Sequence, residues 1–199
     1  MTVIDIDTPH GPARAYLHLA EAPRGALALG HGAGGGVGAR DLVKAKDVAL
    51  GEGFTVALVE QPYKVAGRKS PAPAAQLDTA WRAVIEHLRG EFGELPLITG
   101  GRSAGARVAC RTAADTGANG VLCLAFPLHP PGRPDKTRLP ELDAVEVPTL
   151  IVQGASDPFG MPPSAANREV VAVAGNHSLS SDLAAVGEAA GTWLSRVVS

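Results

Sequence analysis

One short stretch constrains the fold of this chain more than any other. An apolar run at residues 97–99 leads into Gly101-Arg102-Ser103-Ala104-Gly105, which reads G-x-S-x-G, and a helix-forming segment at 106–114 follows. This order predicts a strand, a sharp turn and a helix. The Ser103 hydroxyl would stand over the end of the strand, with glycines where a Cβ would strike neighbouring backbone. An ordinary glycine-rich turn is the alternative, because five common residues match easily.

Buried strands and amphipathic helices alternate along the rest of the chain. Leu77, Trp81, Val84 and Leu88 recur at helical spacing and predict a helix that Gly90 ends. Strands are expected at 25–30, 54–59, 97–100, 121–126, 148–154 and 169–174, further helices at 40–50 and 183–197, and a hairpin at 3–7 and 13–19. This pattern predicts an α/β fold: a mainly parallel, twisted sheet with helices on both faces and an N-terminal antiparallel hairpin.

Length and composition are typical of a globular domain. The 199 residues are 45% hydrophobic and 19% charged, so a single domain over 1–199 is expected. The net charge of −2 argues against a nucleic-acid partner, and no apolar run approaches the roughly 18 residues of a membrane span. The first residues lack the features of a signal peptide. Cys110 and Cys123 have apolar neighbours and no metal-ligand spacing, which predicts reduced thiols, a cytoplasmic location and no metal.

Three of the predicted strands end in groups that could act together in catalysis. Ser103 follows the strand at 97–100, Asp157 the strand at 148–154, and His177 the strand at 169–174. The carboxyl ends of parallel strands meet at one edge of a sheet, where ligands bind. A serine hydroxyl needs a histidine base, which a carboxylate orients, and the order Ser, Asp, His is expected when G-x-S-x-G carries the nucleophile. We therefore predict a catalytic triad of these three residues.

Each partner of the serine has alternatives. Asp157 precedes Pro158 and could be a turn residue that binds its own backbone. His177 could be a surface loop histidine. His129 also follows a strand and is a rival base, although its proline-rich surroundings favour a place in the pocket wall. Asp135 is a rival acid that lies deeper in an expected loop.

Acyl transfer also requires N–H donors for the oxyanion that forms on the attacked carbonyl. One donor is expected from Ala104, the residue after the nucleophile. The second is expected from the glycine-rich loop at 31–35, with the Ala33 N–H favoured and Gly34 next. His31 is expected to brace this loop by a hydrogen bond.

The same loop supports a different hypothesis. Residues 30–35 read G-x-G-x-x-G between a strand and a helix, and Glu60 ends the next strand, where an acid could bind a ribose. A dinucleotide site would leave Ser103, Asp157 and His177 unexplained, so no organic cofactor is expected.

Little of the chain remains for a lid. The segment at 128–142 is the only sizeable insertion near the site, and it is too short and too rich in proline for a helical cap. We therefore expect an open pocket and a small-molecule acyl substrate. Basic residues on the strand-end loops favour an anionic substrate, unless they are ordinary solvated charges. The candidates for substrate binding are His31, Arg102, His129 and Arg133.

Together these segments resemble the α/β-hydrolase superfamily over nearly the whole chain. The resemblance is carried by the loop at 31–35, the turn at 101–105, Gly154-Ala155-Ser156-Asp157-Pro158 and Gly175-Asn176-His177-Ser178. The chain looks most like small uncapped hydrolases related to the testis-expressed and NSL-complex regulatory proteins, which share a segment similar to 126–132. It is also similar to dienelactone hydrolases, which use cysteine where this chain has Ser103. The resemblance implies an α/β-hydrolase fold with no cap domain.

The residues therefore predict a serine hydrolase that cleaves a carboxylic ester, thioester or related acyl bond through an acyl-enzyme. A non-catalytic hydrolase-fold protein that binds a partner is the alternative, since a fold alone does not establish catalysis. A dinucleotide-binding oxidoreductase is less favoured. The sequence leaves the oligomeric state open.

Overall fold

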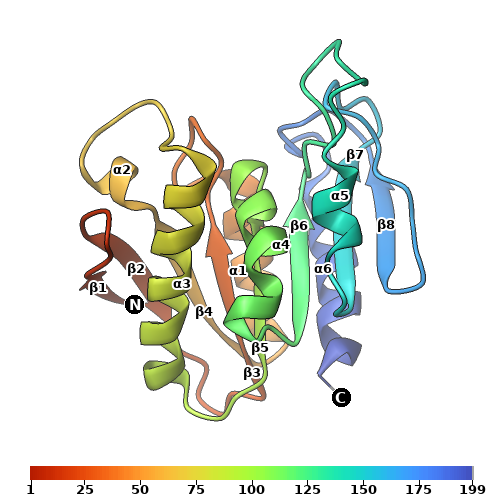
Figure 1. The fold of residues 1–199 in the computed structure, drawn as a ribbon. Coiled ribbons are helices and arrows are strands. Elements are labelled where there is room, and N and C mark those ends of the chain that lie inside the picture. Colours follow the sequence, from red (N-terminus) through yellow and green to blue (C-terminus); the bar gives the residue numbers. More distant parts are fainter. Residues whose placement is uncertain (199) are drawn as a thin grey trace.

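A computed structural model describes residues 1–198, which form one eight-stranded sheet with helices on both faces (Figure 1). The strands are β1 (Thr2–Ile6), β2 (Ala13–His18), β3 (Gly25–Gly30), β4 (Phe54–Glu60), β5 (Leu97–Arg102), β6 (Gly120–Leu124), β7 (Thr149–Gly154) and β8 (Arg168–Val173). The helices are α1 (Arg40–Gly51), α2 (Pro62–Val65), α3 (Ala74–Phe92), α4 (Ala104–Thr116), α5 (Leu139–Asp143) and α6 (Leu183–Val197).

The sheet is antiparallel at one edge and parallel elsewhere. Its strand order is β1-β2-β4-β3-β5-β6-β7-β8. β1 pairs with β2 and β2 with β4 in antiparallel fashion, whereas every pair from β4 to β8 is parallel. This confirms the predicted mainly parallel sheet with an N-terminal hairpin. The carboxyl ends of β3 to β8 therefore lie along a single edge, from which the loops rise at the top of Figure 1.

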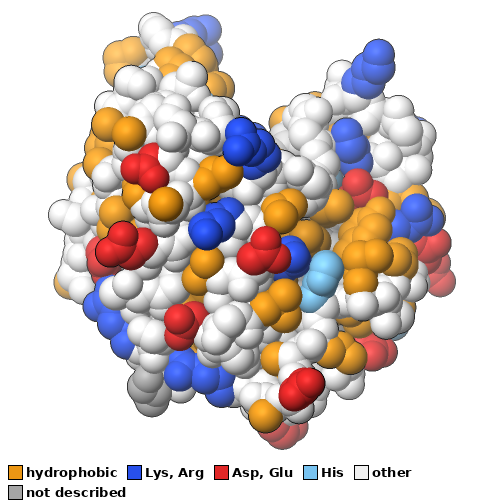
Figure 2. Space-filling view, turned by 180° about the vertical axis from the view of Figure 1, so that it is seen from behind, with side chains coloured by type: hydrophobic (Ala, Val, Ile, Leu, Met, Phe, Trp, Pro, Cys, Tyr) orange, Lys and Arg blue, Asp and Glu red, His pale blue; other side chains and the backbone are white. Residues whose placement is uncertain are grey.

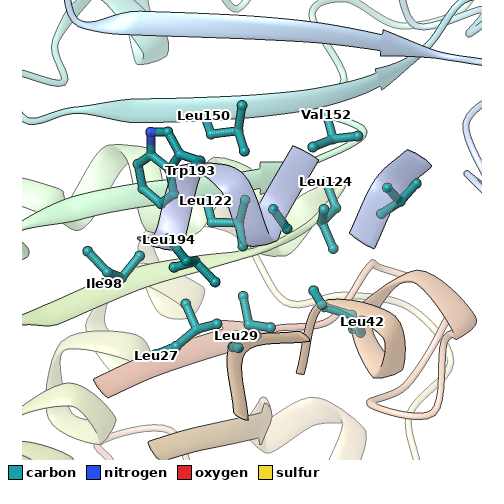
Figure 3. Close-up of a cluster of buried hydrophobic side chains, with 14 of the residues drawn as sticks. Leu27, Leu29, Leu42, Ile98, Leu122, Leu124, Leu150, Val152, Trp193 and Leu194 are labelled. Atoms are coloured by element: carbon teal, nitrogen blue, oxygen red, sulfur yellow. The ribbon is translucent and has the colours of Figure 1, made fainter. Parts of the chain in front are cut away.

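Each face of the sheet carries its own apolar core, because successive side chains of a strand point to opposite faces. On one face, leucines of β3, β6 and β7 pack against α1 and α6, through Leu42, Trp193 and Leu194 (Figure 3). On the other face, alanines of β3 and β4 lie under Trp81 and Leu88 of α3. α4 and α5 cover β6 and β7 on that second face. The helices on both faces are thus held in fixed positions relative to the carboxyl-end edge of the sheet.

Three helical segments differ from the sequence-based expectation. α3 does not end at Gly90: it continues to Phe92, whose ring is buried one turn after Leu88, and Gly93 ends it with φ +62°. α2 is a short helix at a position where the sequence predicted none. α5 lies in the insertion at 128–142, where burial of Leu142 stabilises a single turn. A five-residue helix makes no cap, so the prediction that the domain is uncapped is confirmed.

Among the helices of residues 1–198, none combines the length and the apolar character that crossing a bilayer requires.

The course of α3 predicts the effect of two glycine substitutions. Gly90 lies inside the helix, and a Cβ there would meet no atom within 4 Å. Gly90→Ala should therefore raise the free energy of unfolding by about 0.5–1 kcal/mol, measured by urea denaturation, because alanine restricts the unfolded chain and favours the helix.

Gly93→Ala is the matched control. Its site is equally open, but its φ of +62° disfavours any Cβ, so this variant should be less stable than wild type. Destabilisation by Gly90→Ala would contradict the observed end of α3.

Candidate active site

The three predicted catalytic side chains form one chain of hydrogen bonds. His177 Nε2 lies 2.8 Å from Ser103 Oγ, and His177 Nδ1 lies 2.8 Å from Asp157 Oδ2. The residues come from three separate connections, after β5, β7 and β8. The imidazole nitrogen at Asp157 donates its proton to the carboxylate, so the other nitrogen is free to accept the serine proton. The arrangement can therefore activate a serine hydroxyl.

Ser103 stands on a strained turn, the nucleophile elbow, between β5 and α4. Its φ of 52° and ψ of −109° are rare for a residue with a Cβ. The Ser103 N–H donates to the carbonyl of Leu124 in β6, which holds the turn against the sheet. A Cβ on Gly101 or on Gly105 would lie 2.5 Å from the Gly30 carbonyl oxygen. The two glycines of the motif are therefore required by the close packing of β5 and α4 on the end of β3.

Asp157 is fixed by three donors, although its loop lies at the surface. Its side chain is 1% exposed. Gln153 Nε2 and His177 Nδ1 both donate to Oδ2, and the Phe159 N–H donates to Oδ1. The aspartate thus binds its own backbone, as the turn alternative expected, and also orients the histidine. Burial with three donors holds the carboxylate in one position.

Two residues that support Asp157 and His177 were not predicted from the sequence. Gln153, at the end of β7, is fully buried and donates to Phe126 O, Gly160 O and Asp157. The signal in the sequence was the Gln153 side-chain amide, which follows an apolar run in this strand. Phe159 lies against His177 with ring centroids 4.2 Å apart. It limits the rotation of the imidazole.

The candidate oxyanion donors flank the serine. Ala104 is the first residue of α4, so its N–H has no partner within the helix and lies at the positive end of the helix dipole. The loop after β3 lies alongside, because a Cβ on Gly32 would be 3.6 Å from Ser103 Cβ. Tyr63 donates its hydroxyl proton to the Ala33 carbonyl over 2.9 Å and so fixes this loop. Ala33 and Gly34, the next residues of the loop, stay predictions as second donors.

His31 braces the same loop from below. Its ring is buried, Nδ1–H donates to the Gly32 carbonyl over 2.8 Å, and Nε2 accepts from the Gln61 N–H over 3.1 Å. Burial lowers the pKa of His31, which keeps the imidazole neutral and able to accept. Both nitrogens are engaged by backbone, so the ring has none left for the substrate role that the sequence suggested.

The other substrate-binding candidates lie in different environments. The Arg102 guanidinium contacts Asp41 and the His177 carbonyl. His129 Nδ1 donates to the Pro130 carbonyl, and its ring packs against Gly160. Arg133 is exposed on the loop between β6 and α5, and so is the rival acid Asp135. Of the candidate bases and acids, the structure brings only His177 and Asp157 into contact with each other beside Ser103.

The site opens into a notch rather than a closed cavity. Figure 2 shows the molecule hollowed between two lobes, at the end where Figure 1 places the loops after the strands. One lobe holds the loop at 66–73 and the other the loop at 125–138. A small separate cavity behind the elbow is lined by Ala104, Trp81 and Gln61. Within residues 1–198, no three His, Cys, Asp or Glu side chains gather as a metal site would require.

Comparison with known proteins identifies the family of this chain. Residues 23–185 match the model of the alpha/beta hydrolase domain family. The chain belongs to this family. The glycine-rich loop at 30–35 is thus part of an alpha/beta hydrolase domain.

Similar solved structures show the same fold over nearly their full lengths. A lid-less serine hydrolase from Xanthomonas campestris has 21% identity and a TM-score of 0.76, with 96% of this chain and 94% of that chain covered. Est1E from Butyrivibrio proteoclasticus has 17% identity and a TM-score of 0.78, with 97% of each chain covered. A dienelactone hydrolase from Anabaena variabilis has 17% identity and a TM-score of 0.76, with 96% and 95% covered.

The environment of His31 predicts how the free energy of unfolding of this alpha/beta hydrolase depends on pH. In the folded chain, burial disfavours protonation of His31, whereas in the unfolded chain this imidazole accepts a proton at the usual pKa of 6.5. Below that pH the unfolded state therefore binds more protons than the folded state. The His31 contribution to stability is therefore present at neutral pH and is lost as the pH falls from 6.5 towards the lowered folded pKa. Urea denaturation at pH 7.5 and 5.5 should show a larger loss for wild type than for His31→Gln.

His87→Gln, at an exposed histidine of α3, is the control and should lose as much stability as wild type. Equal losses in wild type and His31→Gln would contradict the role of the buried neutral ring.

Proposed function

We propose that this alpha/beta hydrolase is a serine hydrolase that cleaves a carboxylic ester, thioester or related acyl bond through an acyl-enzyme. The observation that carries the proposal is the unbroken hydrogen-bond chain from Ser103 Oγ through His177 to Asp157. A serine with a purely structural role would not need to be linked through a histidine, by two hydrogen bonds, to a buried carboxylate. The strained backbone of Ser103 adds support, since such strain persists where function requires it.

Acylation follows from the positions of these atoms. Ser103 Oγ attacks the acyl carbon while its proton passes to His177 Nε2. Asp157 accepts the hydrogen bond of Nδ1–H and stabilises the imidazolium that forms. The Ala104 N–H and the Ala33 N–H, with Gly34 as the alternative to Ala33, bind the oxyanion. Collapse of the tetrahedral intermediate breaks the bond to the leaving group, which takes the proton from His177.

Deacylation repeats these steps with water. His177 Nε2 accepts a proton from the water that attacks the acyl carbon, and the oxyanion donors serve again. When the second intermediate collapses, Ser103 leaves and recovers its proton from His177. The acid product departs, and the side chains return to their starting states.

An open notch supports a small or exposed acyl substrate. Est1E, one of the similar structures, was also determined with ferulic acid bound, which is an aromatic carboxylate. Exposed basic residues stand on both lobes, Arg68 and Lys69 on one and Arg133 and Lys136 on the other (Figure 2). They support an anionic substrate as part of the proposal. The free, buried thiols of Cys110 and Cys123 fit the cytoplasm as its location.

Labelling with a fluorophosphonate tests the activated serine. Mass spectrometry should find the adduct on Ser103 in wild type and none in Ser103→Ala. His177→Ala should label at least about 100-fold more slowly, because loss of a general base costs roughly 10²–10⁴ in rate.

Ser164→Ala, at an exposed serine away from the triad, is the control and should label like wild type. Folded wild-type protein that forms no adduct would contradict the proposal and would favour a partner-binding role instead.

Charge on the substrate is tested separately. At low ionic strength, Arg133→Ala should raise KM for an ester with an anionic leaving or acyl group by about threefold and leave KM for a neutral ester unchanged. The difference should vanish in high salt. Arg82→Ala, on the surface of α3, is the control, and equal changes for both esters would refute the charge preference.

A further inference from the structure

The residue before the nucleophile reaches three separate parts of the site. Arg102 Nε donates to Asp41 Oδ2 in α1 over 2.8 Å. Its Nη2 donates to the carbonyl oxygen of His177 over 3.0 Å. Its Nη1 lies against the loop after β3, since a Cβ on Gly32 would be 2.9 Å away. One planar guanidinium thus touches three segments. They are α1, the loop after β3 at 31–35 (the oxyanion loop) and the loop at 175–178 that carries His177 (the histidine loop).

The partner of Arg102 is a buried carboxylate. The Asp41 side chain is 1% exposed and that of Arg102 is 19% exposed. Asp41 Oδ1 accepts the Leu42 N–H, so both carboxylate oxygens are engaged. A buried ion pair is weak evidence for stability, because apolar residues of similar volume often replace it without loss. Its geometry is more informative: Asp41 holds the guanidinium where Nη2 meets the His177 backbone.

The histidine loop has few other attachments to the elbow. Ser103 is tied to β6 through its own N–H, and Asp157 fixes the far side of the imidazole. The backbone of His177, however, lies in the loop that follows β8, the edge strand of the sheet. The bond from Arg102 joins this backbone to the residue that directly precedes Ser103. The start of the histidine loop is also held by Ser156, whose N–H and hydroxyl donate to the Gly175 carbonyl, but that bond ties it to the connection after β7, whereas the Arg102 bond ties the His177 backbone to the elbow.

We propose that Arg102 is a positioning residue, anchored by Asp41, which holds His177 at proton-transfer distance from Ser103. The proposal rests on the proposed serine hydrolase function. It gives Arg102 a role within the protein in place of the substrate-binding role suggested by the sequence, because its guanidinium already has partners. A small error in the position of the histidine would slow the reaction strongly, since a displacement of about 1 Å can lower a rate about 100-fold.

The test removes both charges at once. The double variant Arg102→Met/Asp41→Leu leaves no buried charge unpaired, so it should fold, as circular dichroism and thermal melting will show. With a small neutral aryl ester, kcat should fall about 10- to 100-fold while KM stays within about twofold, because the pair positions the histidine and does not touch the substrate. Arg102→Lys keeps the positive charge but lacks the planar guanidinium, whose N–H groups reach Asp41 and His177 at the same time. It should give an intermediate kcat.

A second, largely buried ion pair between two helices, away from the elbow, provides the control. Arg111 of α4 and Asp78 of α3 are joined over 2.6 Å, with side-chain exposures of 18% and 12%. The double variant Arg111→Met/Asp78→Leu should keep the wild-type kcat. If the folded Arg102→Met/Asp41→Leu variant also keeps it, the positioning role is refuted.

A spectroscopic measurement separates this proposal from the proposed function. The His177 Nδ1 proton, hydrogen-bonded to Asp157, can be followed by ¹H NMR without any substrate. Its resonance should shift or be lost through exchange in Arg102→Met/Asp41→Leu and should be unchanged in the Arg111→Met/Asp78→Leu control. If wild type hydrolyses no ester, the proposed function fails, and this spectrum still decides the positioning role. An identical resonance in wild type and the Arg102→Met/Asp41→Leu variant would overturn it.

Discussion

The structure depends on one close approach of backbone to backbone. The carbonyl of Gly30, at the end of β3, lies where a Cβ on Gly101 or Gly105 would stand. The approach is possible only because both positions are glycine, and it draws the end of β5 and the start of α4 onto β3. The serine between them is left with an unusual backbone conformation and its side chain directed away from the sheet. Every later feature of the site is arranged around that fixed hydroxyl.

Around this point, polar groups beneath the site bind one another rather than solvent. His31 joins Gly32 to Gln61, Gln153 joins Asp157 to Phe126, and Asp41 holds Arg102. The partners in each set come from connections that are distant in the sequence. Buried donors that are bonded in this way have few alternative positions, since each break would leave an unpaired group. The side chains of the proposed triad are therefore supported from below by this set of contacts.

Most of the fold was predictable, because its signals are local. The apolar runs of β3 to β7 and the spacing of Leu77, Trp81 and Leu88 follow from burial alone. The end of α3 was mispredicted, because glycine propensity at 90 competes with burial of Phe92, which only the packed structure reveals. α5 was missed for the same reason: five residues carry no period, and Leu142 becomes helical through the core that it enters.

The contact of Ser103, Asp157 and His177 was predictable from their order and position at strand ends, whereas the groups that support them were not. Gln153, Tyr63 and Asp41 carry no motif, and their roles depend on which loops the sheet brings together. Arg102 illustrates the limit best. A basic residue beside a nucleophile suggests substrate binding when only its neighbours in sequence are known. The buried Asp41, 61 positions earlier in the chain, changes that interpretation.

The absence of a cap changes how such a site can be preorganised. Enzymes with lids exclude water by closing over the substrate, and a site under an open notch has no such closure. In the proposed reaction the fixed dipoles must then come from the protein side: the N-terminus of α4, the loop after β3 held by Tyr63 and His31, and the carboxylate of Asp157. These groups are buried or backbone, so solvent in the notch screens them little. Phe126, at the base of one lobe, accepts a hydrogen bond from Gln153, whereas the exposed tips of both lobes, around Lys69 and Arg133, make none of these contacts. These tips can consequently vary in charge and shape without disturbing the contacts of the proposed triad.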